Sequence, residues 1–515
     1  PLSSWGHAHF YSSTTMSPSI LAGLLVLLVS LWQFINHLLS KKNGRKLPPG
    51  PRGLPIIGNL HTLGNLPHRS FQKLAKKYGP IMSIRLGSVP TIVLSSPQAA
   101  ELFLRTHDRI FASRPKVQSS EYLSYGSKGM AFTEYGPYWR GVRKFCKLEL
   151  LTTMKIDSFA GMRREELGLL VKWLKDAAVA REVVDVSEKV AGLIEDMTYK
   201  MLFGRSKDER FDLKGITQEV TFMAGAFNIA DFVPFLRPLD LQGFTRRFTA
   251  FGRVIDNILE IIISEHEQDA INGQKLNRDF VDVMLSMKNK PINTHDELSY
   301  TLDRSNIKAI ILDMIVGSIG TSHTAIEWIF TELIRHPMVM KKLQDELKTV
   351  IAVDGIVKEI DLPKLEYLDM VIKESIRLHP VAPLLVPRES IEDITVQGYY
   401  IPKGSRVIVN TWALGLDPNV WSESVADFSP ERFIGSNIDL LGRDFQLIPF
   451  GSGRRGCPGI NLGLTNIRLV VAQLVHCFNW ELPNGMPIGE LDMSENFGLS
   501  MPRANHLLAV PIARL

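Results

Sequence analysis

The stretch that decides the fold is FGSGRRGCPG, from Phe450 to Gly459, where one cysteine stands among four glycines and two arginines. A thiolate is a soft, strongly donating ligand for iron, and it needs stabilisation as an anion. Pro458 suits the first position of a helix, which predicts that Cys457 is the N-cap, where free N–H groups lower the pKa of a thiol. Arg455 adds a cation that can bind a carboxylate through two hydrogen bonds. The stretch therefore predicts a metal-ligand role for Cys457.

Two other interpretations of this stretch stay open on its residues alone. It could be a glycine-rich turn that holds a buried cysteine, or a short phosphate-binding loop, although the lysine and hydroxyl of the phosphate-binding motif are missing. The other two cysteines, Cys146 and Cys477, form no CxxC pair. We expect both to be buried as small apolar side chains.

The composition is that of an ordinary globular protein that can bury a large core. The chain has 515 residues, of which 45% are hydrophobic and 22% are charged. Its net charge of +5 is too small to indicate a nucleic-acid partner. Three cysteines without a disulfide or zinc pattern fit a reducing compartment.

Helical and strand patterns predict a mainly α fold with small β-sheets. Helical spacing dominates between about residues 121 and 297, and it recurs at residues 305–335, 365–379 and 462–478. Strand patterns gather at residues 78–94 and 394–410. The sequence contains no internal repeat and no low-complexity tract. We therefore expect residues 61–515 to form a single large domain.

The first sixty residues predict a membrane anchor followed by a hinge. Residues 16–40 contain ILAGLLVLLVSLWQFINHLL, an uncharged run of about 20 residues, which is long enough to span a bilayer. The basic run KKNGRK follows, which predicts that the C-terminal side faces the cytosol. A cleaved signal peptide is the alternative, but there the basic residues would precede the apolar run. The Pro-rich residues within 41–60 predict a stiff spacer, and residues 1–15 are expected to be a non-native or untranslated leader before Met16.

FGSGRRGCPG resembles the haem-binding signature of the cytochromes P-450, Phe-x-x-Gly-x-Arg-x-Cys-x-Gly. Phe450, Gly453, Arg455, Cys457 and Gly459 occupy every fixed position. The resemblance continues along the chain after the anchor, and the stretch NTWALGLDP is similar to the plant microsomal branch. It implies the cytochrome P-450 fold, with a single large haem domain in which the thiolate of Cys457 ligates the iron of haem b.

The resemblance also implies roles for side chains elsewhere. Those expected to contact the haem are Trp139, Arg143, Arg388, Phe450 and Arg455. The motifs KESIR and PERF imply a buried structural cluster of Glu374, Arg377 and Arg432 behind the haem. On their spacing alone, Glu374 and Arg377 are neighbours on a helix face, and the alternative is an ordinary surface ion pair worth less than about 1 kcal/mol.

The oxygen-activating motif of the family departs from its pattern here. The stretch is GSIGTS, where Thr321 and Ser322 match the catalytic hydroxyls but Gly320 replaces the acid and Ser318 replaces a glycine. An acid at that place would feed protons to a relay of hydroxyl and water. Three outcomes are open: water fills the gap; another group, such as Asp313 or His323, substitutes; or the enzyme is weak, uncoupled or performs other chemistry.

The implied activity is a monooxygenase in the endoplasmic reticulum membrane, with its catalytic domain facing the cytosol. It would use O2 and electrons from NADPH, delivered by a flavoprotein cytochrome P-450 reductase, to hydroxylate a small apolar, aromatic plant metabolite. The pocket is expected to include Val381, Leu385 and Leu499. A basic face of Arg140, Lys144, Lys147 and Arg454 is a candidate reductase surface, or simply a solvated helix face. The alternatives are a haem-thiolate isomerase or dehydratase that needs no external electrons, and a non-catalytic or poorly active haem protein.

Overall fold

The computed structural model describes residues 45–273, 279–292, 300–351, 356–422 and 424–514, together with Gly23 and Leu27. The predicted leader and almost all of the predicted anchor at residues 16–40 lie outside the described residues. Among the described residues, two helices are long and apolar enough to cross a membrane, Arg304–Arg335 and Ile460–Cys477. Most of each helix is buried inside the protein, so both are helices of the core.

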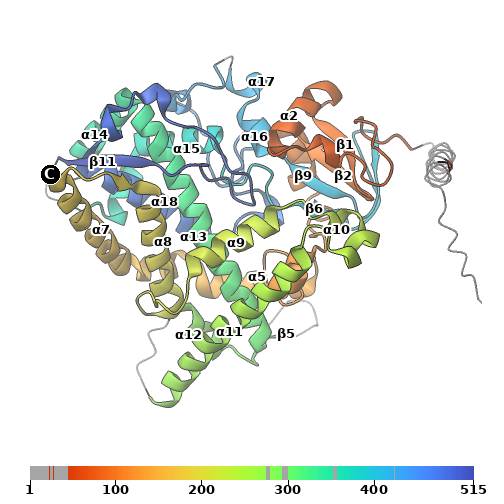
Figure 1. The fold of residues 1–515 in the computed structure, drawn as a ribbon, viewed down its shortest axis with the longest axis horizontal. Helices are drawn as coiled ribbons and strands as arrows, with labels where there is room; N and C mark the ends of the chain where they lie inside the picture. Colours follow the sequence, from red (N-terminus) through yellow and green to blue (C-terminus); the bar gives the residue numbers. More distant parts are fainter. Residues whose placement is uncertain are drawn as a thin grey trace, which may run out of the picture.

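Helices make up most of the described chain, as the sequence predicts (Figure 1). Those before residue 300 are η1 (Leu60–Thr62), α2 (Pro67–Tyr78), α3 (Pro97–Glu101), η2 (Leu102–Thr106), α4 (Gln118–Leu123), α5 (Pro137–Phe145), η3 (Cys146–Leu150), α6 (Thr153–Ser158), α7 (Ala160–Ala180), α8 (Val186–Phe203), α9 (Leu213–Gly225), α10 (Ile229–Phe232), η4 (Pro234–Leu239), α11 (Phe244–Ile271) and α12 (Phe280–Ser286). Those after it are α13 (Arg304–Arg335), α14 (Pro337–Val350), η5 (Glu359–Lys364), α15 (Glu366–Leu378), α16 (Thr411–Gly415), α17 (Pro418–Trp421), η6 (Pro430–Phe433), η7 (Gly453–Arg455), α18 (Ile460–Cys477), η8 (Pro483–Gly485) and η9 (Ile488–Glu490).

The strands form four small sheets, which confirms the predicted fold class. They are β1 (Ile81–Leu86), β2 (Val89–Leu94), β3 (Val184–Asp185), β4 (Pro291–Ile292), β5 (Tyr300–Thr301), β6 (Arg388–Glu389), β7 (Ile394–Val396), β8 (Tyr399–Ile401), β9 (Arg406–Val409), β10 (Phe478–Glu481) and β11 (Leu508–Ala513). The sheet orders are β1-β2-β9-β6, β10-β11-β3, β4-β5 and β7-β8. In Figure 1 the four-stranded sheet lies to one side of the helical body.

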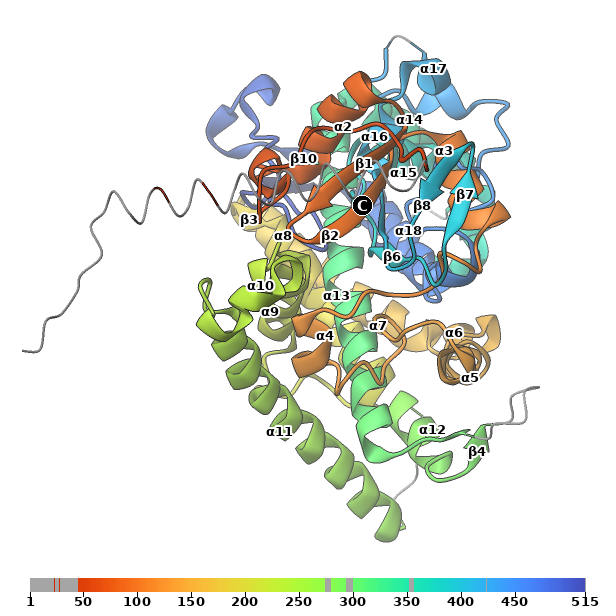
Figure 2. The same ribbon diagram turned by 90° about the vertical axis from the view of Figure 1, so that its right-hand side faces the viewer.

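Helix α13 is the central element of the helical body (Figure 2). It packs against α8, α9, α15 and α18, and apolar side chains such as Ile307, Ile311 and Phe330 are buried on several of its faces. A helix that is apolar all round is expected inside a large core. Its start is fixed by a capping box between Asp303 and Asn306, and it ends at Arg335, before the His336–Pro337 pair.

Strand β9 is an interior strand of the four-stranded sheet. It pairs in parallel with β2, from Thr91↔Arg406 to Leu94↔Val409, and antiparallel with β6, where Glu389 is opposite Arg406. All four residues of β9, RVIV, are buried. The backbone of Arg406 is therefore held from both sides, and its side chain leaves the sheet from a fixed position.

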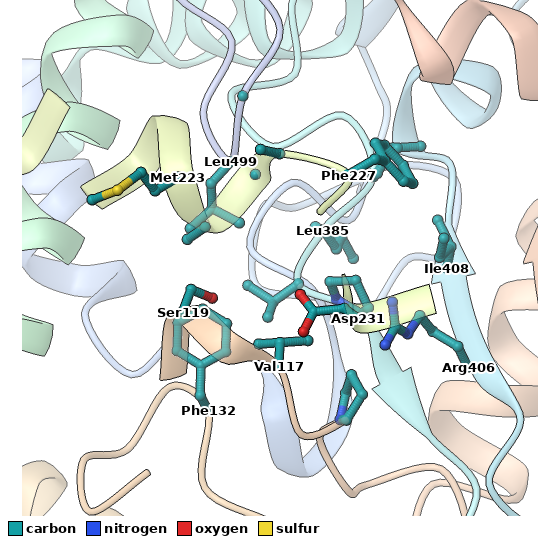
Figure 3. Close-up of a pocket in the computed structure, with 18 of the residues that line it drawn as sticks. Val117, Ser119, Phe132, Met223, Phe227, Asp231, Leu385, Arg406, Ile408 and Leu499 are labelled. Carbon is teal, nitrogen blue, oxygen red and sulfur yellow. The ribbon is translucent and has the colours of Figure 1, made fainter. Parts of the chain in front are cut away.

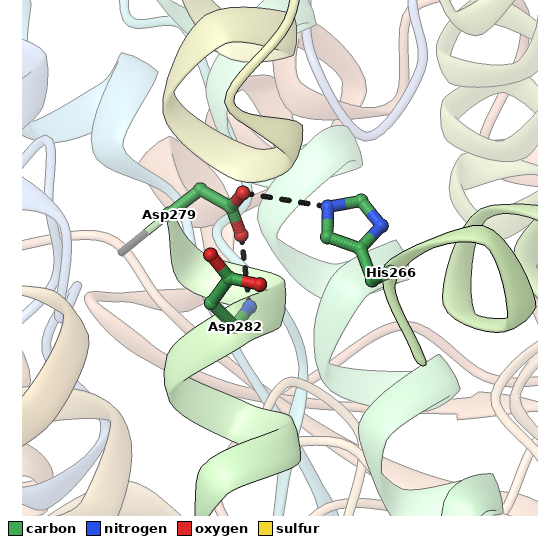
Figure 4. A group of neighbouring side chains, drawn as sticks. All are labelled: His266, Asp279 and Asp282. Carbon is green, nitrogen blue, oxygen red and sulfur yellow. Dashed lines mark hydrogen bonds and ion pairs between the residues drawn. The ribbon is translucent and has the colours of Figure 1, made fainter. Parts of the chain in front are cut away.

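A buried histidine joins the end of α11 to the start of α12 (Figure 4). His266 donates Nδ1–H to the carbonyl of Ile262 at 2.7 Å, and its Nε2 lies 3.3 Å from a carboxylate oxygen of Asp279. Burial lowers the pKa of His266, but these hydrogen bonds outweigh it and the net shift is upward. Both neighbours are acceptors, so the geometry fits a ring that carries both protons.

Candidate active site

The loop from Phe450 to Gly459 presents Cys457 immediately before α18. Its shape is fixed by a turn at η7 and by the N–H of Cys457, which donates to the carbonyl of Phe450 at 2.8 Å. Gly453 has φ 67°, and a Cβ atom there would lie 2.4 Å from the carbonyl oxygen of Leu104. A side chain at this position would therefore clash with backbone, which explains why the loop needs glycine there.

The prediction that Cys457 is the N-cap of this helix is wrong. Helix α18 begins at Ile460 and its N-cap is Gly459, so Pro458 and Gly459 form a turn between the cysteine and the helix. The N–H of Gly459 still donates to the sulfur of Cys457. The anion-stabilising donor is thus present, but it comes from the turn and not from the first turn of the helix.

The surroundings of Cys457 disfavour a free thiolate. Its side chain is solvent-accessible, yet protein atoms surround it, and desolvation raises the pKa of the thiol. The Gly459 N–H and the charge of Arg143 act in the opposite direction without reversing the shift. A coordinated metal ion deprotonates a thiol outright, so the donor set fits an iron ligand.

Guanidinium groups gather beside this loop. Arg143 donates to the carbonyl of Gly456 at 2.6 Å, and Arg388 donates to that of Ser452 at 2.5 Å. Arg455 donates to the carbonyl of Ala112 at 2.6 Å, and its guanidinium lies 4.0 Å over the ring of Trp139.

The positive charges of these guanidinium groups repel one another, and too few carboxylates lie nearby to neutralise them. Desolvation, followed by the repulsion of Arg388 and Arg143, lowers the pKa of Arg455 to about 9. Desolvation lowers the pKa of Arg388 to about 10. Asp108 pairs with Arg388 at 3.1 Å and with Arg454 at 2.8 Å, which leaves several cations facing one carboxylate. A cofactor that carries carboxylates, as haem does through its two propionates, fits this charge.

Sequence analysis missed a fourth arginine of this group, Arg114. It is 6% exposed and donates to the carbonyls of Ala131 at 3.0 Å and Pro387 at 2.8 Å. Desolvation, and then the charges of Arg455, Arg388 and Arg143, lower its pKa. The signal that could have identified it is its place in the stretch IFASRP, where Arg114 follows a mostly apolar run and stands directly before Pro115.

The structure brings Glu374, Arg377 and Arg432 together in one buried cluster. Glu374 accepts from Arg377 Nε at 2.7 Å, from Arg377 Nη2 at 2.8 Å and from Arg432 Nε at 2.8 Å. The side chains of Glu374 and Arg377 are both 0% exposed. The alternative of an ordinary surface pair is therefore excluded. Phe450 is half-buried and packs against the same core, near Gly463 of α18.

Helix α13 runs through the GSIGTS stretch without a break. The hydroxyl of Thr321 donates to the carbonyl of Gly317 at 2.7 Å, and Ser322 is buried. Ser318 hydrogen-bonds Thr198 of α8 at 2.9 Å, so it is tied to a neighbouring helix. A Cβ atom on Gly320 would lie 3.2 Å from Thr217, which leaves little space for the missing acid.

The two groups proposed to replace that acid have different surroundings. Asp313 accepts from the N–H of Ala131 at 3.1 Å and also from that of Met130, and desolvation raises its pKa to about 6. Desolvation lowers the pKa of His323. Asp313 is thus committed to the backbone of the segment 129–133, whereas His323 is neutral at pH 7.

Hydrogen bonds to its backbone hold the segment 129–133 to α13, to α5 and to the cysteine loop. Asp313 of α13 binds its N–H groups, while Trp139 Nε1 donates to the carbonyl of Met130 at 3.0 Å and Arg455 donates to that of Thr133 at 2.5 Å. A Cβ atom on Gly129 would lie 2.3 Å from the Asp313 carboxylate. The segment therefore links α13 to the cysteine loop.

A pocket with a cavity volume of about 90 Å³ has Phe132 of this segment in its wall (Figure 3). Leu385 and Leu499 line it, whereas Val381 does not and instead packs against the main core. Four phenylalanines contribute to the wall, namely Phe132, Phe227, Phe232 and Phe497. Polar side chains are also present, and sequence analysis missed two of them, Asp231 and Arg406.

Comparisons with known proteins agree with this geometry. The family model described as Cytochrome P-450 matches residues 48–510. The chain is 66% identical over 493 residues to Cytochrome P-450 CYP736A12 of Panax ginseng, covering 96% of this chain and 98% of that protein. It is 41% identical over 472 residues to the germacrene A hydroxylase of Saussurea costus, covering 91% and 94%. A zebra fish cytochrome P-450 structure with abiraterone has the same fold, with a TM-score of 0.72 at 24% identity over 87% of this chain and 100% of that one.

Proposed function

This chain belongs to the cytochrome P-450 family and is a haem monooxygenase, and we propose that it hydroxylates a small, mostly apolar plant metabolite at the endoplasmic reticulum membrane. The observation that carries the proposal is the position of the Cys457 sulfur. It lies beside the N–H of Gly459 and next to an anion-deficient group of arginines. Haem bound there would supply the activation of dioxygen, and the protein residues would orient and protect the reaction.

The residues around the site would divide into two roles. Cys457 would ligate the iron, while Arg114, Arg143, Arg388 and Arg455 would offset the charge of the haem carboxylates. Trp139 would contribute by holding the segment 129–133 in place.

Proton delivery during oxygen activation would depend on Thr321. Its hydroxyl can accept a hydrogen bond from a water molecule while it donates to the carbonyl of Gly317. That water, and not a side chain at position 320, would carry protons to the reacting oxygen. One oxygen atom would enter a C–H bond of the substrate and the other would leave as water, with the two electrons coming from NADPH.

The electrons would arrive through a flavoprotein reductase that docks on the cysteine side. Arg140, Lys144 and Lys147 are exposed along α5 and η3, and Arg454 is exposed in the cysteine loop, which Arg143 of α5 contacts at Gly456. A basic surface of this kind complements an acidic partner and steers its approach. The apolar run within residues 16–40 would hold this enzyme on the same membrane as the reductase, with the catalytic domain facing the cytosol.

The pocket supports an aromatic acceptor. The side chains of Phe132, Phe227 and Phe497 can pack against a ring by stacking or by edge-to-face contact. The similarity to a germacrene A hydroxylase favours a terpenoid as the second candidate.

The test is turnover by the full chain in microsomes that also contain a plant reductase. A mixture of plant phenolics and terpenes is supplied with NADPH and isotopically labelled dioxygen, and products are read by mass spectrometry. We expect an NADPH-dependent product that carries one labelled oxygen atom, and none from Cys457→Ser. Turnover without NADPH would instead establish the isomerase or dehydratase, and folded protein without bound haem would reject the proposal.

A further inference from the structure

Arg406 places a buried cation in the wall of the pocket. It is the first residue of β9, its exposed fraction is 6%, and its guanidinium lies 4.6 Å over the ring of Phe232. Figure 3 shows its side chain extending from the strand toward Asp231 of α10, with Leu499 on the opposite side of the pocket. The interior position of β9 in its sheet fixes the point from which this side chain starts.

The donors of Arg406 lack acceptors within the part of the chain that the structure describes. Its Nε is buried without a hydrogen-bond partner, and neither the hydrogen bonds nor the ion pairs of the described residues include its side chain. A guanidinium has five N–H donors, and a buried donor without an acceptor costs free energy that a hydrogen bond would recover. An acceptor that enters the pocket with a ligand would recover it.

Three other buried arginines do not share this complete lack of acceptors. Arg114, Arg377 and Arg455 are similarly buried, but each donates to backbone carbonyls. Backbone carbonyls of the protein accept their hydrogen bonds. Arg406 therefore differs in having its donors directed at a cavity.

The surrounding charges determine which acceptor fits. Asp231 and Glu389 both interact electrostatically with Arg406, so two carboxylates already oppose one cation. Asp231 is held in place by the N–H of Gln118 at 2.8 Å, and burial raises its pKa. A ligand carboxylate would be repelled by these acids. A hydroxyl is neutral, can accept from Arg406 and can donate to Asp231.

We propose that Arg406 and Asp231 bind a hydroxyl group of the substrate, so that the enzyme takes an apolar alcohol or phenol and not a hydrocarbon. This inference rests on the proposed function. The hydroxyl would be held at the β9 side of the pocket, and the apolar end would extend toward Leu499, whose N–H donates to Thr221 beside the Gly320 turn. Oxidation would then occur away from the existing hydroxyl. The substrate would come from a reaction that has already introduced oxygen.

The test measures binding by the haem-loaded full chain, through the shift of its Soret band during titration. Two matched sets of probes separate the hydroxyl from the scaffold: 4-phenylphenol, 4-methoxybiphenyl and biphenyl, and farnesol, farnesyl methyl ether and farnesene. On at least one scaffold we expect the alcohol or phenol to bind about tenfold or more tightly than the hydrocarbon, a difference of about 1.4 kcal/mol. The methyl ether should lie between them, because it can accept from Arg406 but cannot donate to Asp231.

Variants assign this preference to its residues. Arg406→Met should bind the alcohol and the hydrocarbon about equally. Asp231→Asn should lose most of the difference in affinity between the alcohol and the ether. The control variant Arg443→Met, at an exposed arginine, should leave both preferences unchanged. Arg406→Lys tests the same point if the methionine variant does not fold. The inference is overturned if the wild type shows no hydroxyl preference on either scaffold, or if both folded Arg406 variants keep it in full. Absence of haem or of NADPH-dependent product would instead count against the proposed function.

Discussion

Removing Glu374 should destabilise the protein far more than removing an exposed acid from the same helix. Glu374 is fully buried and accepts four hydrogen bonds: two from Arg377, one from Arg432 Nε at 2.8 Å and one from the N–H of Ser429 at 2.8 Å. At roughly 1 kcal/mol net for each bond, their loss amounts to about 4 kcal/mol. Breaking a buried ion pair by deleting one partner costs about 3–5 kcal/mol, which gives the same magnitude. We therefore expect Glu374→Ala to lower the free energy of unfolding by about 4 kcal/mol.

The matched control lies on α15 as well. Asp369 pairs with Arg468 at 2.7 Å, but these side chains are 36% and 29% exposed, so Asp369→Ala should cost less than about 1 kcal/mol. Both variants are unfolded with urea in detergent, and the transition is followed by tryptophan fluorescence and by loss of the thiolate-haem Soret band. Glu374→Gln keeps the volume of the side chain and isolates the effect of its charge. If Glu374→Ala unfolds within 1 kcal/mol of the wild type, the cluster does not hold the core as argued.

Four further outcomes are expected from the same structure. Cys457→Ser should keep its circular dichroism spectrum but lose the red-shifted Soret band of the reduced, carbon-monoxide-treated protein; a retained band would show that another residue is the ligand. Gly320→Asp should raise the product formed per NADPH consumed, because the added carboxyl group would supply protons to the water at Thr321; unchanged coupling would contradict the view that the missing acid limits the relay. The pKa of Asp313 is about 6 in the folded state and about 4 in the unfolded state, so the folded state takes up the proton at a higher pH. Lowering the pH from 7 to 5 should therefore raise the free energy of unfolding of the wild type by about 1 kcal/mol relative to Asp313→Asn, as measured by urea unfolding. Charge reversal at Lys144 and Lys147 should slow reduction by the reductase more at low salt than at high salt, and a salt-independent effect in stopped-flow measurements would contradict steering.

Local patterns were sufficient to predict the long elements of the fold. The helix expected at residues 305–335 is α13, Arg304–Arg335, and the one expected at 365–379 is α15, Glu366–Leu378. These segments combine strong periodicity with clear stop signals, such as Pro337 after α13. The start of α18 was misplaced because Pro458 fits equally well in a turn before a helix, and only the fold decides between the two.

The polar side chains of the pocket could not be found in this way. Arg406 and Asp231 are 175 residues apart, and their common pocket depends on how α10 lies against the four-stranded sheet. Arg114 looks like any arginine until the fold places it beside Arg388 and Arg455. Sequence motifs identify residues that act through a fixed local spacing, whereas these residues act through tertiary neighbours.

The way in which the segment 129–133 is anchored has a consequence for how this enzyme can diversify. Its ties to Asp313, Trp139 and Arg455 all use main-chain atoms, and Gly129 is the position that leaves no space for a side chain. Phe132, whose side chain lines the pocket, can therefore be exchanged while the same backbone bridge persists. Substitutions at Phe132 would change which substrates fit the pocket without weakening the contacts that hold this segment beside the cofactor site. New substrate specificities can therefore arise at this position.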